Sequence, residues 1–382
     1  MMRNNSQKVY VGMSGGVDSS VTAALLQQQG YDVTGVYMKN WSQDLPGMKC
    51  PWREDYQDAK RVAVQLGIPF KMYDFEREYR ERVVDYMLDG YRSGITPNPD
   101  IMCNQEVKFK LFLETALADG ADMIATGHYA RISRPDGERA QLLTGVDSNK
   151  DQSYFLYRVT EAALTKSLMP IGEYEKPAVR ELAHKFGLAT AAKKDSQGIC
   201  FVGKVGIKEF LQQFVSADEP GMGPGTIIDR SGKVIGEHEG ALFYTIGQRH
   251  GLNVGGGLPY YVVGKDMWRN EVYVTTDLSD SGLWHNELEL TNLHWINGPP
   301  CEVDESRQPI TYWVRTRYRA PLVKCFVSRS VAEVEGAHNW RVKLSEEVRA
   351  LTPGQSAVLY EVLPVADGRP AGYRVVGGGI VI

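Results

Sequence analysis

The pattern of apolar and polar residues changes character once along the chain. In the first part, short apolar runs alternate with stretches in which apolar residues recur at helical spacing, an order typical of a parallel α/β sheet with crossover helices. The runs that we expect to be strands are residues 8–13, 32–38, 68–75 and 122–129. The expected helices are residues 19–29, 54–66 and 104–118, with a charged helix after residue 75.

Glycine and proline set the limits of these elements. Gly30 and Gly67 follow the first two expected helices, a common place for glycine at a helix end. The turn TPNPD at residues 96–100 contains two prolines, which we expect to exclude helix there. Helical segments are expected to continue from residue 104 to about residue 216.

Beyond that point the apolar residues form short strand-like runs between turns rich in glycine and proline. Examples are ALFYTI at 241–246 and ITYWVRTRYR at 310–319. Such spacing predicts small all-β domains or a barrel. We therefore expect an α/β domain over residues 1–215, a small central β-rich domain over 216–284 and a C-terminal β-barrel over 285–382.

Composition and charge limit the class of protein to which the chain can belong. Of the 382 residues, 43% are hydrophobic and 24% are charged, and the net charge of -4 argues mildly against a nucleic-acid binder unless a local basic patch overrules it. No run reaches the roughly 18 apolar residues of a membrane span, and no apolar core of a secretory signal is visible. The five cysteines are an odd number without a CxxC pair, which does not make a secreted disulfide framework. We expect a cytoplasmic protein.

A glycine-rich turn, SGGVDS at residues 14–19, joins the first strand to the first helix. Glycines let successive backbone N–H groups converge on an anion, and the following helix adds its positive N-terminal end. Ser14 and Ser19 supply hydroxyl donors, and Asp18 can cap the helix or approach a magnesium ion. These features favour a phosphate site; an ordinary strand-to-helix turn is the alternative.

Two other phosphate loops do not fit the sequence. Gly12, Gly15 and Gly16 have the wrong spacing for GxGxxG, and no lysine follows them as in a Walker loop. GICFVGK at 198–204 matches GxxxxGK, but Val205 replaces the magnesium-binding Ser or Thr and no clear strand precedes it. Without a lysine to brace a γ-phosphate, the loop at 14–19 better suits a departing pyrophosphate.

Two cysteines have surroundings that favour reactivity. Cys103 immediately precedes an expected helix, whose N-terminus favours the thiolate, and Asp100 could exchange a proton with a reacting group. Cys200 follows Lys193 and Lys194, which make the local field positive. No spacing typical of a zinc site occurs. The remaining cysteines are more simply interpreted as small buried apolar residues: Cys50, Cys301 and Cys325.

A basic and aromatic segment at residues 311–330 contains no acidic residue. If the segment is a strand, Arg315, Arg317 and Arg319 share one face, which would suit an RNA backbone. A solvated strand face is the alternative interpretation.

Several segments, in this order, resemble the bacterial tRNA-specific 2-thiouridylases, a family of PP-loop ATP pyrophosphatases. The segments are GMSGGVDSS, TPNPDIMCN, ATGHYAR, GVDSNKDQSYFL, KKDSQGICF, YTIGQRHGL, RTRYR and TPGQSAV. The resemblance runs from residue 8 nearly to the C-terminus. It implies a Rossmann-like PP-loop domain, and an enzyme that adenylates the 2-oxygen of the wobble uridine and replaces it with sulfur.

The resemblance also implies roles for individual residues. The implied ATP-binding residues are Gly12, Met13, Ser14, Gly15, Gly16, Val17, Asp18 and Ser19, with Met38 and Gly127 beside the adenosine. The implied catalytic residues are Asp100, Cys103 and Cys200. The implied tRNA contacts are Asn98, Pro99 and Asp100 at the target base, and His128, Asn149, Lys150, Asp151, Arg317, Tyr318 and Gln355 elsewhere. For His128 and Asp151, a structural role is the alternative.

In the implied reaction, Cys200 carries a persulfide and Cys103 helps to release its sulfur. The sulfur attacks directly, or leaves as hydrosulfide while a Cys103–Cys200 disulfide forms. ATP, Mg²⁺ with the ATP, tRNA and a sulfur-donor or relay protein are the implied cofactors and partners. Two alternatives stay open. Another PP-loop ligase would need no paired cysteines, and a non-catalytic RNA-binding protein would cleave no ATP.

Overall fold

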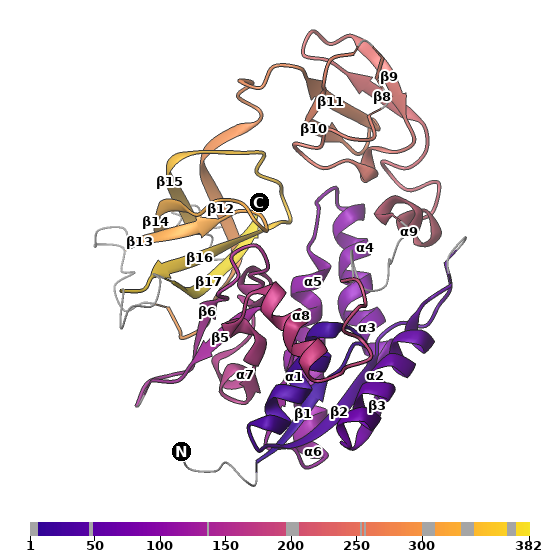
Figure 1. Ribbon diagram of the computed structural model, residues 1–382. Coiled ribbons are helices and arrows are strands. Elements are labelled where there is room, and N and C mark those ends of the chain that lie inside the picture. Colours follow the sequence, from indigo (N-terminus) through magenta and orange to yellow (C-terminus); the bar gives the residue numbers. More distant parts are fainter. Residues whose placement is uncertain are drawn as a thin grey trace.

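The first domain is built on a five-stranded parallel sheet (Figure 1). The computed structural model describes residues 7–45, 49–135, 137–195, 206–252, 254–255, 257–299, 310–329, 340–364 and 372–382. In sheet order, the strands are β3 (Phe70–Asp74), β2 (Asp32–Lys39), β1 (Lys8–Gly12), β4 (Met123–Ala125) and β7 (Ser167–Leu168). The parallel α/β sheet predicted from the apolar runs is confirmed.

Helices cover both faces of this sheet, which is why its strands are apolar on both sides. Val9 and Val11 of β1 pack in one core and the intervening Tyr10 packs in another, as the alternation of a strand requires. One face is covered by α1 (Val17–Gln28), α2 (Trp52–Leu66) and α8 (Lys176–Lys185). The other is covered by α3 (Glu76–Tyr79), η1 (Arg80–Val84), α4 (Asp85–Arg92), α5 (Pro99–Met102), η2 (Cys103–Leu111) and α6 (Phe112–Ala118).

The expectation that the TPNPD turn excludes helix is wrong. A helical run begins at Pro99 and continues through the π-helical segment η2 to Ala118. Proline is tolerated at the first helical position because the N–H group it lacks has no partner there in any helix. Asn98 caps the run, since its side-chain oxygen accepts a hydrogen bond from Ile101 N at 3.4 Å.

A hairpin that we did not expect follows β4 and links the first domain to the barrel. Its strands are β5 (Ala130–Ser133) and β6 (Gln141–Thr144), and β6 pairs with barrel strand β17 (Tyr373–Val381). The first domain therefore contributes two strands to the sheet of the barrel. The other short elements of this part are η3 (Ser153–Leu156), α7 (Glu161–Thr165), η4 (Pro170–Glu173) and α9 (Ile207–Phe214).

The central domain carries a four-stranded sheet. Its strands are β8 (Gly225–Ile228), β9 (Val234–His238), β10 (Tyr261–Asp266) and β11 (Glu271–Thr275). The expected strand at 241–246 is instead the short 3-10 helix η5 (Ala241–Phe243). The apolar run turns there because its side chains enter two cores: Leu242 packs in the core of the first domain and Tyr244 in that of the central domain.

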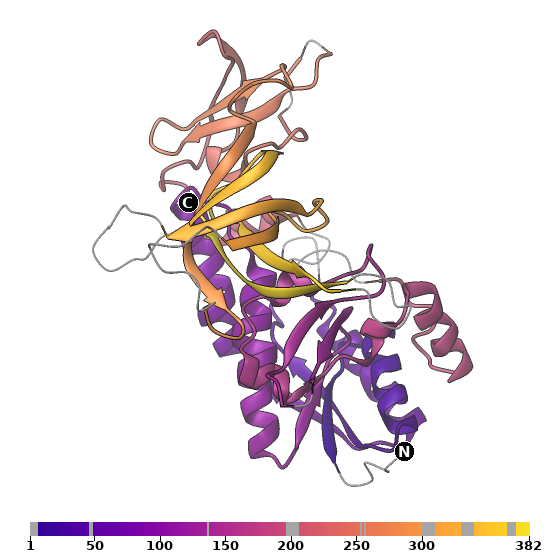
Figure 2. The ribbon, with the colours of Figure 1, turned by 90° about the vertical axis from the view of Figure 1, so that its left-hand side faces the viewer.

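The C-terminal domain is a barrel, closed by pairing of its first and last strands. Around it run β12 (Trp284–Trp295), β15 (Trp340–Arg349), β14 (Val323–Arg329), β13 (Ile310–Arg315), β16 (Ser356–Val362) and β17. Figure 2 shows the barrel between the central domain and the first domain. In the part of the chain that the structure describes, no helix is both long and apolar enough to cross a membrane.

Candidate functional site

The glycine-rich loop lies at the carboxyl edge of the parallel sheet, between β1 and α1. β2 lies on one side of β1 and β4 on the other, so the strand order reverses at β1, where open α/β sheets bind their ligands. A Cβ atom on Gly12 would lie 2.9 Å from the Met38 methyl group, and one on Gly127 would lie 2.8 Å from Ser19 N. The structure thus brings the loop, Met38 and Gly127 together.

The loop leaves the start of α1 open to an anion. Gly15 has φ +75°, and a Cβ atom there would lie 2.3 Å from the Asp55 carbonyl oxygen, so only glycine fits. Ser14 N donates to Ser19 Oγ at 3.2 Å, which fixes the curve of the loop. Gly16 is the N-cap residue of α1 and, as a glycine, has no side chain that could cap the first N–H groups of the helix, which are the groups that bind anions at helix N-termini.

Asp18 is held by residues that the sequence did not single out. Lys176 Nζ lies 2.7 Å from Asp18 Oδ1 and 2.9 Å from Oδ2, and the Tyr129 hydroxyl donates to Oδ1 at 2.7 Å. The loop itself contains no lysine. Lys176 of α8, which lies 158 positions after Asp18 in the chain, places its ammonium group beside the loop. Lys176 was missed because it looks like an ordinary charged residue at a helix start. Only the fold places it beside the loop.

An ionic cluster extends from this point towards the KKDSQGICF segment. Lys150 Nζ lies 2.7 Å from Asp195 Oδ2, and Lys176 Nζ lies 2.9 Å from Asp195 Oδ1. Burial alone would raise the pKa of Asp195, but the hydrogen bonds from Lys150 and Lys176 outweigh it and lower this pKa to about 2. Lys193 pairs with Asp55 and Asp58 at 2.8 and 2.7 Å. Its charge is therefore balanced locally by these two carboxylates.

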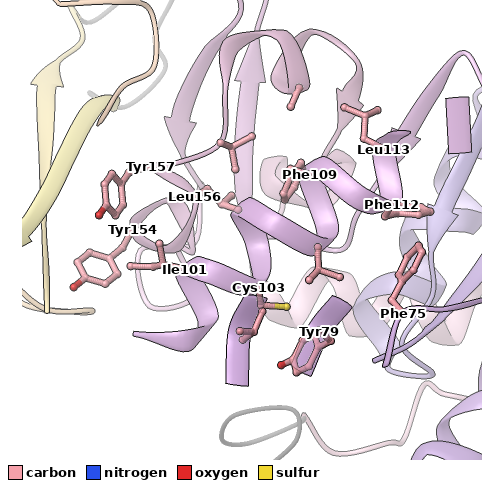
Figure 3. Close-up of a cluster of buried hydrophobic side chains, with 14 of the residues drawn as sticks. Phe75, Tyr79, Ile101, Cys103, Phe109, Phe112, Leu113, Tyr154, Leu156 and Tyr157 are labelled. Carbon is pink, nitrogen blue, oxygen red and sulfur yellow. The ribbon is translucent and has the colours of Figure 1, made fainter. Parts of the chain in front are cut away.

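Cys103 lies inside the helical run rather than at its start (Figure 3). Because the run begins four residues earlier, at Pro99, the expectation that a helix N-terminus activates this thiol is wrong. The side chain is 3% exposed and belongs to the cluster of apolar residues around Tyr79 and Ile101. One turn away, burial raises the pKa of Asp100, against a smaller opposing effect of Lys108. A carboxyl group with a raised pKa suits proton exchange.

The other cysteines differ in their surroundings. Cys200 and Cys301 lie outside the described residues. Cys50, Cys103 and Cys325, the cysteines that the structure describes, are in the reduced thiol form. Burial raises the pKa of Cys325 to about 12, which makes it an unreactive core residue as the sequence indicated.

The arginines of the RTRYR segment do not share a strand face. β13 ends at Arg315, and Arg319 adopts a left-handed conformation with φ +62°. The three arginines therefore point to different partners. Arg315 Nη1 lies 3.2 Å from Asp151 Oδ2, and Arg319 Nε donates to Asn149 O at 3.1 Å.

Three of the expected tRNA contacts lie beside these arginines: Asn149, Asp151 and Tyr318. The Tyr318 ring lies 4.6 Å from that of Phe155 and beneath the Arg319 guanidinium at 5.1 Å. Asp151 is only 4% exposed and accepts hydrogen bonds from Gly145 N and from the Ser153 hydroxyl, both at 3.0 Å. The structural role considered for Asp151 therefore fits its surroundings, while Asn149 and Tyr318 lie beside the exposed Arg319.

Arg317 and Gln355 join the domains. Arg317 Nη2 donates to Ile246 O of the central domain at 2.9 Å and to the Thr352 hydroxyl of the barrel at 2.7 Å. Gln355 Nε2 donates to Thr96 O at 2.7 Å, and Thr96 N donates to Pro353 O at 2.9 Å. The barrel thereby holds the chain that leads into α5, which begins with Asn98 as its N-cap and continues through Pro99 and Asp100.

His128 is buried and directly follows Gly127 in the chain. Its Nδ1 atom lies 2.8 Å from the Thr126 hydroxyl, and its ring lies 5.7 Å from that of Phe109. Burial, with a smaller effect of Lys108, lowers its pKa well below the usual value, so the ring is neutral. These contacts fit the structural alternative, and contact with tRNA stays a prediction.

Comparison with known proteins identifies similar chains over the full length. Family models match in succession: the tRNA methyl transferase HUP domain at residues 7–204, the tRNA methyl transferase PRC-barrel domain at 208–276 and the aminomethyltransferase beta-barrel domain at 285–381. The tRNA-specific 2-thiouridylase MnmA of Bacillus subtilis is 45% identical over 380 residues, which cover 99% of this chain and 96% of that protein. The same enzyme of Staphylococcus aureus strain JH9 is 46% identical over 361 residues, 94% of each chain.

Likeness to solved structures is weaker. A 4-thiouridine synthetase in complex with RNA and bound ATP aligns at 20% identity and a TM-score of 0.36, over 55% of this chain and 51% of that one. This likeness is too low to compare the sites.

Proposed function

The chain belongs to the tRNA-specific 2-thiouridylase family, and we propose that it uses ATP to replace the 2-oxygen of the wobble uridine of tRNA with sulfur. One observation carries this function: the similarity to the 2-thiouridylases extends over 99% of the chain, including all the segments quoted above. The position of the glycine-rich loop, at the strand-order reversal of the sheet, supports an ATP site there.

In the first step, the uridine 2-oxygen attacks the α-phosphate of ATP and pyrophosphate leaves. We propose that the leaving pyrophosphate is bound by the first N–H groups of α1 and by the hydroxyl groups of Ser14 and Ser19, which lie together at the start of this helix. Because these donors are fixed by the loop before ATP arrives, little reorganisation is needed as charge develops.

The residues of the loop also fit a magnesium ion carried by ATP. Such an ion keeps several waters and phosphate oxygens and needs only one or two protein carboxylates, and Asp18 supplies one at the start of α1. When bound, it would offset negative charge on the phosphates. Among the described residues, no group of three or more acidic, histidine or cysteine side chains forms a metal site by itself, so we assign the ion to the nucleotide.

The second step transfers sulfur to C2 of the adenylated uridine. A persulfide on Cys200 attacks C2 and AMP leaves; Cys103 then attacks the Cys200 sulfur, which releases the thiouridine and forms a Cys103–Cys200 disulfide. Alternatively, Cys103 first frees hydrosulfide from Cys200, with the same disulfide as product. A sulfur-donor or relay protein loads Cys200, and a reductant restores the thiols between turnovers.

The proposal is tested with the full chain, ATP, a persulfide donor and tRNA that lacks the modification. We expect AMP release that depends on tRNA, and 2-thiouridine at the wobble position in the nucleoside digest. Release of AMP without tRNA would indicate another PP-loop ligase. Binding of tRNA without any ATP cleavage would indicate a non-catalytic RNA-binding protein.

A further inference from the structure

The turn between β10 and β11 presents a tryptophan to solvent. Trp268 is 87% exposed, the highest fraction for any large apolar side chain that the structure describes, and it is the only aromatic ring among those exposed side chains. The side chain of its neighbour Arg269 is 73% exposed. Both residues lie between Asp266, the last residue of β10, and Glu271, the first residue of β11. The turn therefore carries an indole ring and a guanidinium group that a partner can reach.

Hydrogen bonds fix this turn without any help from the indole ring. Asp266 Oδ1 accepts from Trp268 N and from Arg269 N, both at 2.9 Å. Asn270 has φ +53°, and its Nδ2 atom lies 3.2, 3.1 and 3.0 Å from the carbonyl oxygens of residues 222, 223 and 224. The backbone that carries the ring is thus held in place before a partner arrives, which lowers the entropy cost of binding.

Met267 anchors the same turn to the first domain. A Cβ atom on Gly94, which follows the end of α4, would lie 2.8 Å from Met267 Cγ, and the Met267 side chain packs against the cores of both the first and the central domain (Figure 1). Gly94 lies four residues before Asn98, where the segment implied at the target base begins. Four residues span at most about 14 Å. Trp268, the next residue after Met267, therefore lies close to that segment.

The surroundings of the ring favour a nucleic-acid base over a protein. A protein interface needs several buried anchors over roughly 800 Å² of each partner, but the neighbours of Trp268 in the turn are polar or charged, apart from Met267. A single ring is enough for a base to stack on, and a guanidinium group beside it suits a phosphate. The carboxylates at the two ends of the turn are both engaged: Asp266 with the backbone, and Glu271 with the Tyr273 hydroxyl at 2.6 Å.

We propose that Trp268 stacks on an unpaired base of the tRNA anticodon loop, while Arg269 binds an adjacent phosphate. This inference rests on the proposed function, which brings the wobble uridine of that loop to the first domain. The bases that flank the uridine then lie beside the turn, because Met267 holds the turn against the chain that leads to Asn98. The ring gives the protein a hold on the loop outside the target base. Trp268 thus contributes to the binding and orientation of tRNA and not to the chemistry.

The test measures binding of unmodified tRNA, and of its isolated anticodon stem-loop, at several salt concentrations. We expect Trp268→Ala to weaken binding of both RNAs roughly fivefold or more with an unchanged salt slope, since stacking releases no counterions. Trp268→Phe keeps a ring and should bind within about twofold of wild type. Arg269→Gln should instead reduce the slope of log K against log salt by about 1. Leu258→Ala is the matched control, because Leu258 is another exposed apolar side chain of the central domain and should not affect binding.

Each outcome decides a separate question. Equal affinities of wild type and Trp268→Ala, or an equal loss in Trp268→Phe or Leu258→Ala, would overturn the stacking contact. A loss with whole tRNA but not with the stem-loop would overturn the assignment to the anticodon loop. Unchanged tRNA binding with slower loading of sulfur by the donor would make the ring a protein contact instead. Since Trp268 is exposed, its variants should fold normally, which a thermal melt checks. If the wild-type protein binds no tRNA, the proposed function itself fails.

Discussion

At the scale of single residues, the two implied reactive cysteines should fail at different steps. Cys200→Ser keeps the size and polarity of the side chain but cannot hold a persulfide, so we expect tRNA-dependent adenylation without thiolation. Cys103→Ser should still allow Cys200 to be loaded, but turnover should stop because nothing resolves the persulfide. Labelling with radioactive sulfur, followed by mass analysis of protein and tRNA, checks both variants.

Cys325→Ser is the matched control for this pair, because it is fully buried in the barrel core. We expect it to lower the free energy of unfolding by about 1–3 kcal/mol, through burial of a hydroxyl group, while the folded protein stays active. A persulfide on Cys103 in the Cys200→Ser protein, with thiolated tRNA still formed, would reverse the two assignments.

Asp100 should show opposite effects on stability and on activity. Burial raises its pKa in the folded state, so the folded protein binds this proton more tightly than the unfolded chain. Stability is therefore lost as the pH rises from the unfolded pKa, about 3.9, through the raised folded value. Asp100→Asn removes this loss, and we expect it to raise the free energy of unfolding at pH 7 more than at pH 5 while thiolation falls.

Urea denaturation at the two pH values measures the effect on stability. The control is Asp119→Asn. Hydrogen bonds from Lys71 and Tyr73 lower the pKa of Asp119, so this substitution should destabilise the protein at pH 7. If both substitutions lower the free energy of unfolding at pH 7 equally, the ionised carboxylate of Asp100 is stabilised by a partner in the folded state. Its pKa would then not be raised by burial.

At the scale of elements, the contact between the β4 loop and the start of α1 should govern ATP use. A methyl group at position 127 would lie 2.8 Å from Ser19 N, so Gly127→Ala must displace the start of α1, whose N–H groups we propose as phosphate donors. We expect kcat/KM for ATP to fall roughly tenfold to a hundredfold, as misplacement of a binding group by about 1 Å can cause. Binding of tRNA, measured by filter retention, should change little.

Asp18→Ala and Ser14→Ala should likewise impair AMP formation while tRNA binding is retained. Gly255→Ala is the control, because a methyl group there would meet no atom within 4 Å. Unchanged AMP formation in all the loop variants would remove the ATP site from this loop.

The sequence predicted helices and strands correctly wherever a local pattern of residues is enough to define the element. The apolar runs predicted β1, β2 and β3, and Gly30 and Gly67 marked the ends of α1 and α2. The hairpin β5–β6 does not follow from the sequence pattern, because its strands are four residues each and β6 joins a larger sheet only through β17, more than 200 positions away. The prolines of TPNPD did not indicate the start of the helical run at Pro99, because proline breaks a helix at interior positions but is tolerated at the first one.

The residues of the candidate site also fall into two groups: those that a local sequence pattern identifies and those that depend on distant contacts. Ser14, Asp18 and their neighbours are recognisable because a phosphate loop is contiguous in sequence. Lys176 and Asp195 are not, since their roles come from contacts between α1, α8 and the chain after α8. Arg317 belongs to this second group as well, because its bonds to Ile246 and Thr352 depend on how the central domain meets the barrel.

At the scale of the whole molecule, the junction of the domains should control tRNA binding apart from direct phosphate contacts. Arg317 is engaged with a carbonyl of the central domain and a hydroxyl of the barrel, whereas Arg319 is exposed, donates through Nε to Asn149 O and lies over the Tyr318 ring. We therefore expect Arg319→Ala to weaken tRNA binding and to reduce the slope of log K against log salt by about 1, because one phosphate contact and its counterion release are lost.

Arg317→Ala should weaken tRNA binding by a different route. It removes the bonds that hold the central domain against the barrel, so affinity should fall while the salt slope stays at the wild-type value, and the melting temperature should fall as well. Gln355→Ala releases the barrel loop from Thr96 and should behave like Arg317→Ala. Titrations of tRNA at several salt concentrations separate the two routes. A reduced slope for Arg317→Ala with an unchanged melting temperature would mean that its guanidinium leaves the junction to bind phosphate, as the resemblance to the family first implied.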